Sequence, residues 1–273
     1  SLELWRRLAY LWHGRAQGAA CKHWGEAMRK NVLITGASSG LGAGMARAYA
    51  ERGHDLALCA RRREQLQALR DELLARHPER RIVVRQLDVN DHAQVFEVFA
   101  DCTAELGGLD RVIVNAGIGS GRPIGCGGFT DNLATLQTNL IAALAQCEAA
   151  VEIFRRQNRG HLVVVSSVAA LRGFPGGMTA YSASKAGLAT LAEGIRAELL
   201  GTPIKVTTLY PGYIRTPLNA GAERLPFAVD LETGVRALVA AIEREPAAVF
   251  VPAWPWRLVG FLLQRLPLRL LPR

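Results

Sequence analysis

The sequence predicts an α/β protein: a doubly wound parallel sheet with helices on both faces, formed by a single domain. Short runs of apolar and β-branched residues recur along the 273-residue chain, and they do not alternate with polar residues. Such runs are typical of strands that are buried on both faces. Longer stretches with helical character separate the runs, so consecutive strands are expected to be parallel and joined by helices.

The expected elements follow one another from residue 31 onwards. Strands are expected at Asn31–Thr35, Asp55–Ala60, Arg81–Leu87, Asp110–Val114, His161–Ser166, Ile204–Tyr210 and Ala248–Val251. Helices are expected from a Gly-rich turn to about Arg52, in the arginine-rich stretch after the second strand, and at about 91–106, 131–157 and 180–200. In folds of this kind, ligands bind beyond the carboxyl ends of the strands.

The two ends of the chain stand outside this alternation, so the sheet domain is expected to span residues 31–252. Residues 1–30 are rich in Trp, Arg and Ala, and the composition of this extension suits an amphipathic helix. Residues 253–273 form a basic, apolar tail that mixes Trp, Leu and Arg. From residue 254 the tail is compatible with a helix lying on a membrane surface, and equally with a tail that packs on the domain or on a partner subunit.

The composition is that of a globular protein with a formal net charge of +9. This charge is compatible with an anionic ligand, a membrane surface or nucleic acid. The arginines form no continuous stripe and lack interleaved aromatic residues, so nucleic acid is not an expected partner. The five cysteines show no Cys-x-x-Cys spacing, which argues against a disulfide framework or a metal site. The sequence has no apolar stretch long enough for a transmembrane helix, and nothing in it resembles a signal peptide. We therefore expect a cytoplasmic protein, which could also contact a membrane surface.

A Gly-rich turn follows the first expected strand and opens a helix. It reads Thr35-Gly36-Ala37-Ser38-Ser39-Gly40-Leu41-Gly42. Its glycines allow a tight turn and a close approach of backbone N–H groups to a pyrophosphate, and the helix N-terminus adds the positive end of its dipole. A plain Gly-Ser loop is the alternative, but the strand-turn-helix context favours a nucleotide site. The expected cofactor contacts are Gly36, Ser38, Ser39, Gly40, Leu41 and Gly42.

Arginines follow the second expected strand, where an NAD site would carry an acidic residue for the ribose 2′-hydroxyl. Ala60 stands at that position and Arg61 follows it. Arg61 is therefore expected to bind a 2′-phosphate, which predicts NADP(H) in preference to NAD(H). Arg62 is a second candidate contact, although Arg62 and Arg63 also suit the exposed start of a basic helix.

Tyr181 and Lys185 are separated by one helical turn, so they are expected to share one face of a helix. A nearby ammonium stabilises a phenolate, so we expect Lys185 to lower the pKa of Tyr181 and to create a proton donor that works near neutral pH. The chain has only four lysines, which makes this pairing more informative. The alternative is two unrelated exposed side chains on a solvated helix.

Further motifs occur in an order that resembles the short-chain dehydrogenase/reductase family. Besides the Gly-rich turn and the Tyr181–Lys185 pair, they are Asp88-Val89, Asn115-Ala116-Gly117, Asn139, Ser166-Ser167 and Pro211-Gly212-Tyr213-Ile214-Arg215-Thr216. The resemblance covers about residues 30–252. It implies a Rossmann-like catalytic domain, an oxidoreductase and a homodimer or homotetramer.

The resemblance also implies roles for four catalytic residues. Tyr181 would be the general acid or base, and Lys185 would lower its pKa and bind the nicotinamide ribose. Ser167 would polarise the carbonyl oxygen, and Asn139 would anchor a water in a proton relay. Ser166 is the alternative to Ser167. Ser167 lies one residue further from Tyr181 than is usual in the family, but it remains the closer candidate. An Asn in mid-helix and an Asp at a strand end are also common as plain structural contacts.

The remaining implied contacts surround the cofactor. Asp88 and Val89 would contact the adenine, and the cofactor channel would be lined by Asn115, Ala116 and Gly117. The carboxamide of the nicotinamide would be held by the segment that contains Pro211, Gly212, Ile214 and Thr216.

Substrate choice is expected to depend on three apolar segments: Ile118–Phe129, the residues after Ser167, and Leu218–Phe227. Because they carry few charges, we expect a small apolar carbonyl or alcohol substrate. Two other function classes remain open: a non-catalytic NADP(H)-binding regulator or scaffold, and a membrane-surface adaptor. Neither needs a proton donor, so the combined presence of Asn139, Ser167, Tyr181 and Lys185 favours an NADP(H)-dependent oxidoreductase.

Overall fold

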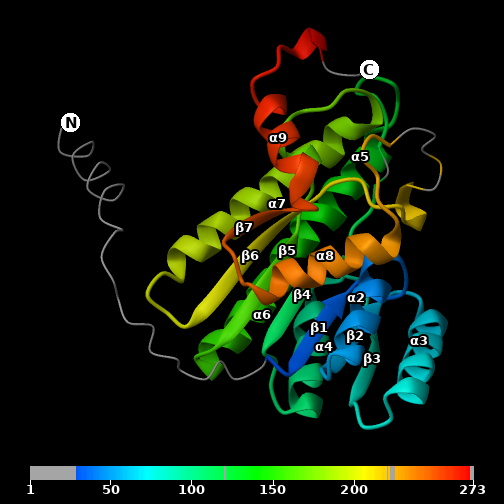
Figure 1. Ribbon diagram of the computed structural model, residues 1–273, viewed down its shortest axis with the longest axis vertical. Helices are drawn as coiled ribbons and strands as arrows, with labels where there is room; N and C mark the ends of the chain where they lie inside the picture. The colour runs from blue at the N-terminus through cyan, green and yellow to red at the C-terminus, as the bar shows by residue number, and fades with distance from the viewer. Residues whose placement is uncertain (1–28, 120, 220, 222–224, 271–273) are drawn as a thin grey trace.

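The computed structural model describes residues 29–119, 121–219, 221 and 225–270, and the expected extension up to residue 28 lies outside this part. Its centre is one seven-stranded sheet with all neighbouring strands parallel, in the order β3-β2-β1-β4-β5-β6-β7 (Figure 1). The strands are β1 (Asn31–Thr35), β2 (Asp55–Ala60), β3 (Ile82–Gln86), β4 (Arg111–Val114), β5 (Gly160–Val165), β6 (Ile204–Pro211) and β7 (Ala248–Val251). The predicted fold class, a doubly wound parallel sheet, is confirmed.

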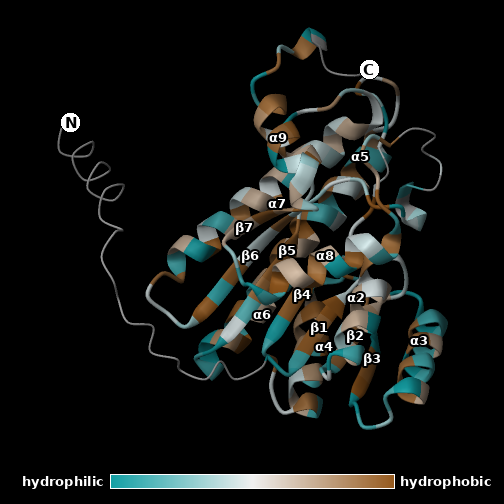
Figure 2. Ribbon diagram, in the orientation of Figure 1, coloured by the Kyte–Doolittle hydropathy of each residue, from teal (hydrophilic) through white to brown (hydrophobic). Residues whose placement is uncertain are grey.

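Helices cover both faces of the sheet. One apolar core joins the sheet to α4 (His92–Leu106), α6 (Ala142–Gln157) and α7 (Thr179–Glu198). The opposite core joins it to α2 (Gly40–Glu51), α3 (Arg63–Arg76) and α8 (Leu231–Glu243). Neighbouring residues of one strand face opposite cores: Leu33 belongs to the first core, and Val32 and Ile34 belong to the second. Burial on both faces explains why the strands read as unbroken apolar runs, and Figure 2 shows the resulting hydrophobic centre.

The remaining helices lie around the carboxyl ends of the strands. They are α5 (Phe129–Leu136), a π-helical turn η1 (Gln137–Ile141), three 3-10 turns η2 (Val168–Leu171), η3 (Gly176–Met178) and η4 (Pro217–Asn219), α9 (Ala253–Leu263) and a last 3-10 turn η5 (Leu268–Leu270). The stretch expected as one helix at 131–157 is therefore α5, η1 and α6 in succession. Within the described residues, no helix has the length and apolar character needed to cross a bilayer.

Helix α8 was missing from the sequence prediction, and α9 lies in the tail, where a helix was only one of two alternatives. Helix α8 begins at a capping residue, because the Asp230 carboxylate accepts a hydrogen bond from the Thr233 backbone N–H at 2.8 Å. This Asp cap before an apolar, periodic run is a sequence signal that identifies the helix. Helix α9 has a weaker signal, since Pro255 lies near its start and Trp254 has non-helical backbone angles.

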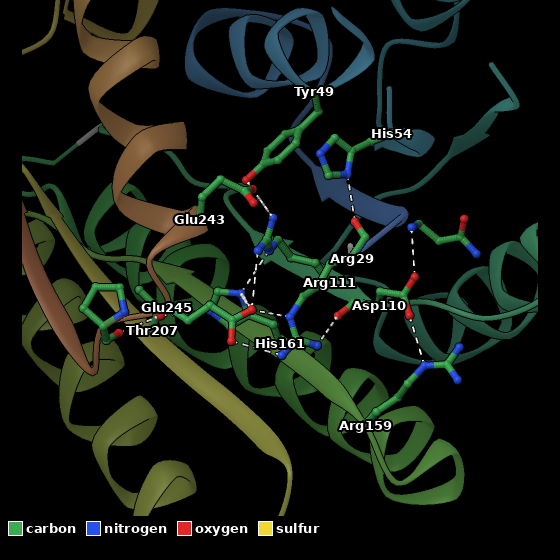
Figure 3. Close-up of polar contacts among 12 residues, drawn as sticks. Arg29, Tyr49, His54, Asp110, Arg111, Arg159, His161, Thr207, Glu243 and Glu245 are labelled. Atoms are coloured by element: carbon green, nitrogen blue, oxygen red, sulfur yellow. Dashed lines mark hydrogen bonds and ion pairs between the residues drawn. The ribbon is translucent and has the colours of Figure 1, made fainter. Parts of the chain in front are cut away.

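A buried polar cluster lies at the amino ends of the strands, where β4 and β5 begin (Figure 3). Arg111 at the start of β4 is almost completely buried, and its guanidinium donates to the carboxylate of Glu243 at the end of α8 and to Nδ1 of His161, at 2.9 Å. Glu245 accepts from Arg29, which precedes β1. The cluster therefore ties the end of α8 to the middle of the sheet through charged hydrogen bonds.

The same contacts fix the protonation of His161. Since Nδ1 accepts from Arg111, the proton is on Nε2, which donates to the Thr207 hydroxyl at 2.9 Å. That hydroxyl donates onward to the carbonyl oxygen of Pro246 at 2.6 Å. Burial holds the pKa of His161 well below its ordinary value of 6.5, and the charge of Arg111 lowers it further.

We predict that this histidine makes the fold sensitive to acid. Below about pH 6.5 the unfolded chain binds a proton at His161 and the folded chain does not, so stability falls with pH. Between about pH 7 and about pH 5, the free energy of unfolding of His161→Gln should fall by about 2 kcal/mol less than that of the parent. Urea unfolding at each pH measures this difference. The exposed His92, changed to Gln, should retain the parent's pH dependence, and an identical loss in all three proteins would contradict the prediction.

Candidate active site

The Gly-rich turn after β1 is closely packed against the end of β4. Gly36 has a positive φ of 66°, and a Cβ there would come within 2.9 Å of Ala116 Cα. A Cβ on Gly42 would overlap the carbonyl oxygen of Gly36. The Thr35 hydroxyl accepts from the backbone N–H groups of Asn115 and Ala116, both at 3.1 Å. The turn and the Asn115–Gly117 segment therefore form one rigid cradle, and only glycine fits at its closest points.

Arg62 lies across this turn. Its guanidinium donates to the Ser38 hydroxyl at 2.8 Å and to the Ser39 hydroxyl at 2.6 Å. Arg61, which the sequence favoured, is exposed, and among the described hydrogen bonds it contributes its backbone carbonyl to Gln86. Both arginines follow β2, but the geometry brings Arg62 rather than Arg61 to the serines of the turn. The predicted role of Arg61 stays a prediction.

The loop after β3 brings Asp88 and Val89 to the same edge of the sheet. Val89 is buried, and Asp88 accepts from the backbone N–H of Asn90 at 3.0 Å, which closes a short turn. Asn90 in turn contacts the Thr138 hydroxyl at 3.2 Å in η1. Asp88 therefore has the structural contact of a strand-end turn, and its predicted contact with adenine stays a prediction.

Asn139 is fully buried in the π-helical turn η1. Its side-chain oxygen accepts from the Ile118 N–H, and its side-chain nitrogen donates to the Ile118 carbonyl, both at 2.8 Å. The same nitrogen donates to the Ser184 hydroxyl at 3.2 Å. A Cβ on Gly117 would come within 3.0 Å of the Asn139 oxygen. Asn139 thus joins the segment after β4 to α7, and the π turn, a feature common at functional sites, sets its position.

Helix α7 is fixed against the end of β5 by two hydrogen bonds. The Lys185 ammonium donates to the carbonyl oxygen of Val165 at 2.9 Å, and the Ser166 hydroxyl donates to the backbone carbonyl of Lys185 at 2.8 Å. Ser166 is buried, and its hydroxyl proton is used in this structural contact. The geometry therefore favours Ser167 over Ser166 as the serine of the site.

The Ser167 hydroxyl accepts from the Ala169 N–H at 3.1 Å, which caps η2, and it lies close enough to Tyr181 to influence the pKa of that phenol. The longer spacing between Ser167 and Tyr181 is accommodated by the 3-10 turns η2 and η3. The Lys185 nitrogen lies 5.9 Å from the centre of the Tyr181 ring. The structure thus brings Tyr181, Ser167, Lys185 and, through Ser184, Asn139 into one cluster.

The electrostatics of this cluster differ from the sequence-based expectation. Burial raises the pKa of Tyr181 above its ordinary value; the nearby Ser167 hydroxyl opposes this shift and the nearby Tyr213 adds to it. Burial also lowers the pKa of Lys185 to about 8. The expected lowering of the Tyr181 pKa by Lys185 is therefore not found, because the ammonium is directed at the Val165 carbonyl and burial is the dominant effect. At neutral pH Tyr181 carries its proton.

The segment after β6 closes the site. Ile214 is buried and pairs with Val229, and the Thr216 N–H donates to the side chain of Asn219 at 2.9 Å. Thr216 faces the Gly-rich turn, because a Cβ on Gly40 would lie 3.6 Å from its Cβ. Pro211 ends β6 next to Gly212. The segment that was predicted to hold the nicotinamide carboxamide therefore lies next to the Gly-rich turn that was predicted to bind the pyrophosphate.

Two aromatic residues of this region were not predicted as site residues. Tyr213 is close enough to Tyr181 to influence its pKa, and Trp256 of α9 packs edge-on against Tyr213 with ring centres 5.4 Å apart. Trp256 is buried and occupies the space beside Gly212, where any Cβ would overlap its indole. Tyr213 lies within the Pro211–Thr216 motif, which was a usable signal. Trp256 lies in the tail, where no motif or spacing points to the site.

Comparison with known proteins identifies the family. The family model described as short chain dehydrogenase matches residues 30–224. The chain therefore belongs to the short-chain dehydrogenase family, whose members are oxidoreductases that use nicotinamide cofactors. The expected dimer or tetramer stays a prediction.

Individual relatives agree with this assignment. An uncharacterized oxidoreductase of Mycobacterium tuberculosis is 54% identical over 245 residues, which cover 90% of this chain and 97% of that protein. An NADP-dependent 3-hydroxy acid dehydrogenase of Salmonella typhi is 33% identical over 184 residues, or 67% of this chain and 72% of that protein. The crystal structure of a family member from Burkholderia phymatum in complex with NAD has a TM-score of 0.77 and 22% identity, covers 86% of this chain and 92% of its own, and shows likeness of fold.

We predict that the buried lysine costs stability. Because its pKa falls from 10.5 to about 8 on folding, the charged form is disfavoured by about 3 kcal/mol below about pH 8, and this cost disappears above about pH 10.5. Loss of the bond to Val165 offsets part of the gain, so Lys185→Met should be about 2 kcal/mol more stable than the parent at neutral pH.

Urea unfolding across this pH range measures the effect. Exposed Lys205, changed to Met, is the matched control and should leave stability almost unchanged at every pH. A Lys185→Met protein that is less stable than the parent at neutral pH would contradict the prediction.

Proposed function

We propose that the protein is an NADP(H)-dependent oxidoreductase that interconverts an apolar carbonyl compound and its alcohol. The observation that carries this proposal is that the Ser167 and Tyr181 hydroxyls lie next to each other beside the buried Lys185. The pair lies beyond the carboxyl end of β5, at the edge of the sheet where parallel α/β folds bind their ligands.

The residues at this edge fit a dinucleotide. Gly36 and Gly42 leave no room for side chains, so backbone groups line the turn at the start of α2, where a helix dipole favours phosphate. Asn115, Ala116 and Gly117 extend the cradle toward Lys185, whose nitrogen lies 3.5 Å from where a Cβ on Gly117 would be. Thr216 lies on the other side of the turn, next to Gly40. When bound, the nicotinamide supplies the hydride.

The protein's own groups then supply the proton and the orientation. Tyr181 is protonated at neutral pH and gives its hydroxyl proton to the substrate oxygen. Ser167 donates a hydrogen bond to the same oxygen and holds the carbonyl in place. Lys185 supplies positive charge near the phenolate that forms on Tyr181. Asn139 holds the backbone of Ile118 in place through its side-chain oxygen. In the oxidation direction Tyr181 accepts the proton, which higher pH favours.

The preference for NADP(H) rests on the arginines after β2. Arg62 places a guanidinium on the serines of the phosphate-binding turn, and Ala60 leaves the position of an NAD-type carboxylate without an acid. Arg61 is adjacent and exposed, so it is a second donor for a 2′-phosphate. The NADP dependence of the relative from Salmonella typhi supports the same preference.

The preference for an apolar substrate rests on the residues around the proton donor. Tyr213 and Trp256 form an aromatic wall beside Tyr181, and Phe227 contacts Trp256 with ring centres 6.1 Å apart. The loop between β4 and α5 adds Ile124 and Phe129, both strongly exposed. Aromatic and aliphatic walls with few polar groups favour apolar ligands.

A non-catalytic NADP(H)-binding regulator or scaffold is the alternative. It would need the glycines and arginines but no proton donor. The combination of Asn139, Ser167, Tyr181 and Lys185 at one place counts against it, because a cofactor sensor does not need a proton donor.

Replacing Tyr181 with Phe tests the proposed proton donor. Because the variant lacks the proton donor, kcat should fall by about 10²- to 10⁴-fold, while NADPH affinity should change little. Turnover is followed by NADPH absorbance with aldehydes, ketones and secondary alcohols of graded chain length. Tyr210→Phe, which stacks on Phe250, is the matched control and should retain activity. Turnover by Tyr181→Phe at the parent's rate would sink the mechanism.

Replacing Arg62 with Ala tests the proposed preference for NADPH over NADH. Arg62→Ala should bind NADPH about tenfold more weakly and NADH almost unchanged, because only NADPH carries the 2′-phosphate. Calorimetric titration measures both affinities. Arg63→Ala is the matched control, and Arg61→Ala tests whether the adjacent arginine shares the contact. An equal loss of NADPH and NADH affinity in Arg62→Ala would mean that Arg62 only stabilises the turn.

A further inference from the structure

Helix α9 is fixed at the active-site edge of the sheet by one of its faces. It begins directly after β7, at the carboxyl end of the strand, and lies at the upper end of the view in Figure 1. Trp256 is buried beside Gly212, and Gly260 packs against Leu171 and Phe250. The Arg172 guanidinium donates to the carbonyls that follow α9, at 3.1 Å and 2.7 Å, and so holds its far end.

The other face of α9 exposes large apolar side chains to solvent. Leu258, Phe261 and Leu262 are 48%, 54% and 47% exposed, and their spacing places them on one side of the helix. Trp254, 73% exposed, precedes them at the start of the helix. Figure 2 shows the apolar colouring of this projecting segment. Clustered, exposed apolar residues of this kind mark an interaction surface.

The charged side chains in the sequence of this segment all have the same sign. After Glu245 the sequence contains no acidic residue, but it contains Arg257, Arg265, Arg269 and Arg273. The Arg265 guanidinium lies over the Phe261 ring, 3.7 Å from its centre. A cation is therefore held directly beside the exposed apolar stripe.

We propose that the exposed face of α9, formed by Trp254, Leu258, Phe261 and Leu262, docks on an anionic lipid bilayer. Tryptophan, leucine and phenylalanine beside arginines are the composition of helices that lie in the headgroup region, where apolar burial and attraction to anionic lipids add together. A second copy of the chain fits less well, because a two-fold contact through α9 would bring the same arginines together without an acidic partner.

Docking in this way turns the active-site edge toward the lipid. Trp256 connects α9 to the Gly212–Tyr213 segment, and Phe227 next to it is exposed at the same edge. An apolar carbonyl compound would then reach Tyr181 from the bilayer. This consequence rests on the proposed function, whereas the docking itself does not.

Co-sedimentation of the full chain with vesicles tests the proposal. The vesicles contain phosphatidylcholine alone or phosphatidylcholine mixed with phosphatidylglycerol. The parent should bind the anionic vesicles, and high salt should weaken that binding. Phe261→Glu should lower the partition coefficient about tenfold or more, because it removes apolar burial and adds a negative charge. Leu200→Glu is the matched control: Leu200 is an exposed leucine at 76%, beyond the end of α7, and should leave partitioning unchanged.

A charge-reversal variant and two physical measurements complete the test. Arg265→Glu, a charge reversal at an exposed position, should also weaken binding to the anionic vesicles, and circular dichroism verifies that each variant is folded. Equal sedimentation of Phe261→Glu and the parent overturns the proposal, as does failure of the parent to bind anionic vesicles. Light scattering measures the oligomeric state of each protein. If the parent is an oligomer that does not bind vesicles, and Phe261→Glu dissociates it, then α9 is a contact between copies and the proposal is wrong. All these readouts are independent of catalysis.

Discussion

The hydrogen bond from the Lys185 ammonium to the Val165 carbonyl fixes α7 on the end of β5, and the geometry of the site depends on it. It orients the helix that carries Tyr181 and brings its backbone within reach of the Ser166 hydroxyl. Ser184, one residue before Lys185, meets Asn139 in the π turn. A charge placed here must be fully desolvated, and the structure accepts that loss of stability in order to hold the ammonium near the phenol.

The two polar clusters at opposite edges of the sheet are built for different purposes. At the amino edge, both ring nitrogens of His161 have partners within the protein, and Arg111 pairs with both glutamates at the end of α8, Glu243 and Glu245. Such satisfied networks favour one arrangement of the elements that they join. At the carboxyl edge, the Ser167 hydroxyl accepts from a single backbone group, the Ala169 N–H, and lies close to Tyr181. The same sheet thus separates the groups that stabilise it from the groups proposed to be catalytic.

The sequence was sufficient for the fold and for much of the site, because both depend on local patterns. Double burial produces unbroken apolar strands, and the close approach of backbone at Gly36 and Gly42 demands glycine. It was not sufficient where the outcome depended on side-chain direction in three dimensions. Arg61 and Arg62 are adjacent in sequence, and only the path of the chain after β2 decides which one meets the serines.

The same limit applies to energies and to distant contacts. The pKa of Tyr181 depends on the balance of burial against charge, and motif spacing contains no information about burial. Trp256 reaches the site from the tail, more than forty residues after Tyr213, and its contacts depend on how α9 packs after β7. The π turn at Asn139 interrupts a sequence that reads as one continuous helix.

The contact between Gly212 and Trp256 has an evolutionary consequence. The indole fills the volume that any side chain at 212 would need, so the two positions are complementary in size. A substitution at 212 is tolerated only after Trp256 has been replaced by something smaller, and a large residue at 256 is compatible only with glycine at 212. The order in which these two positions can change is therefore constrained, and the tail and the turn after β6 are expected to diverge together among relatives.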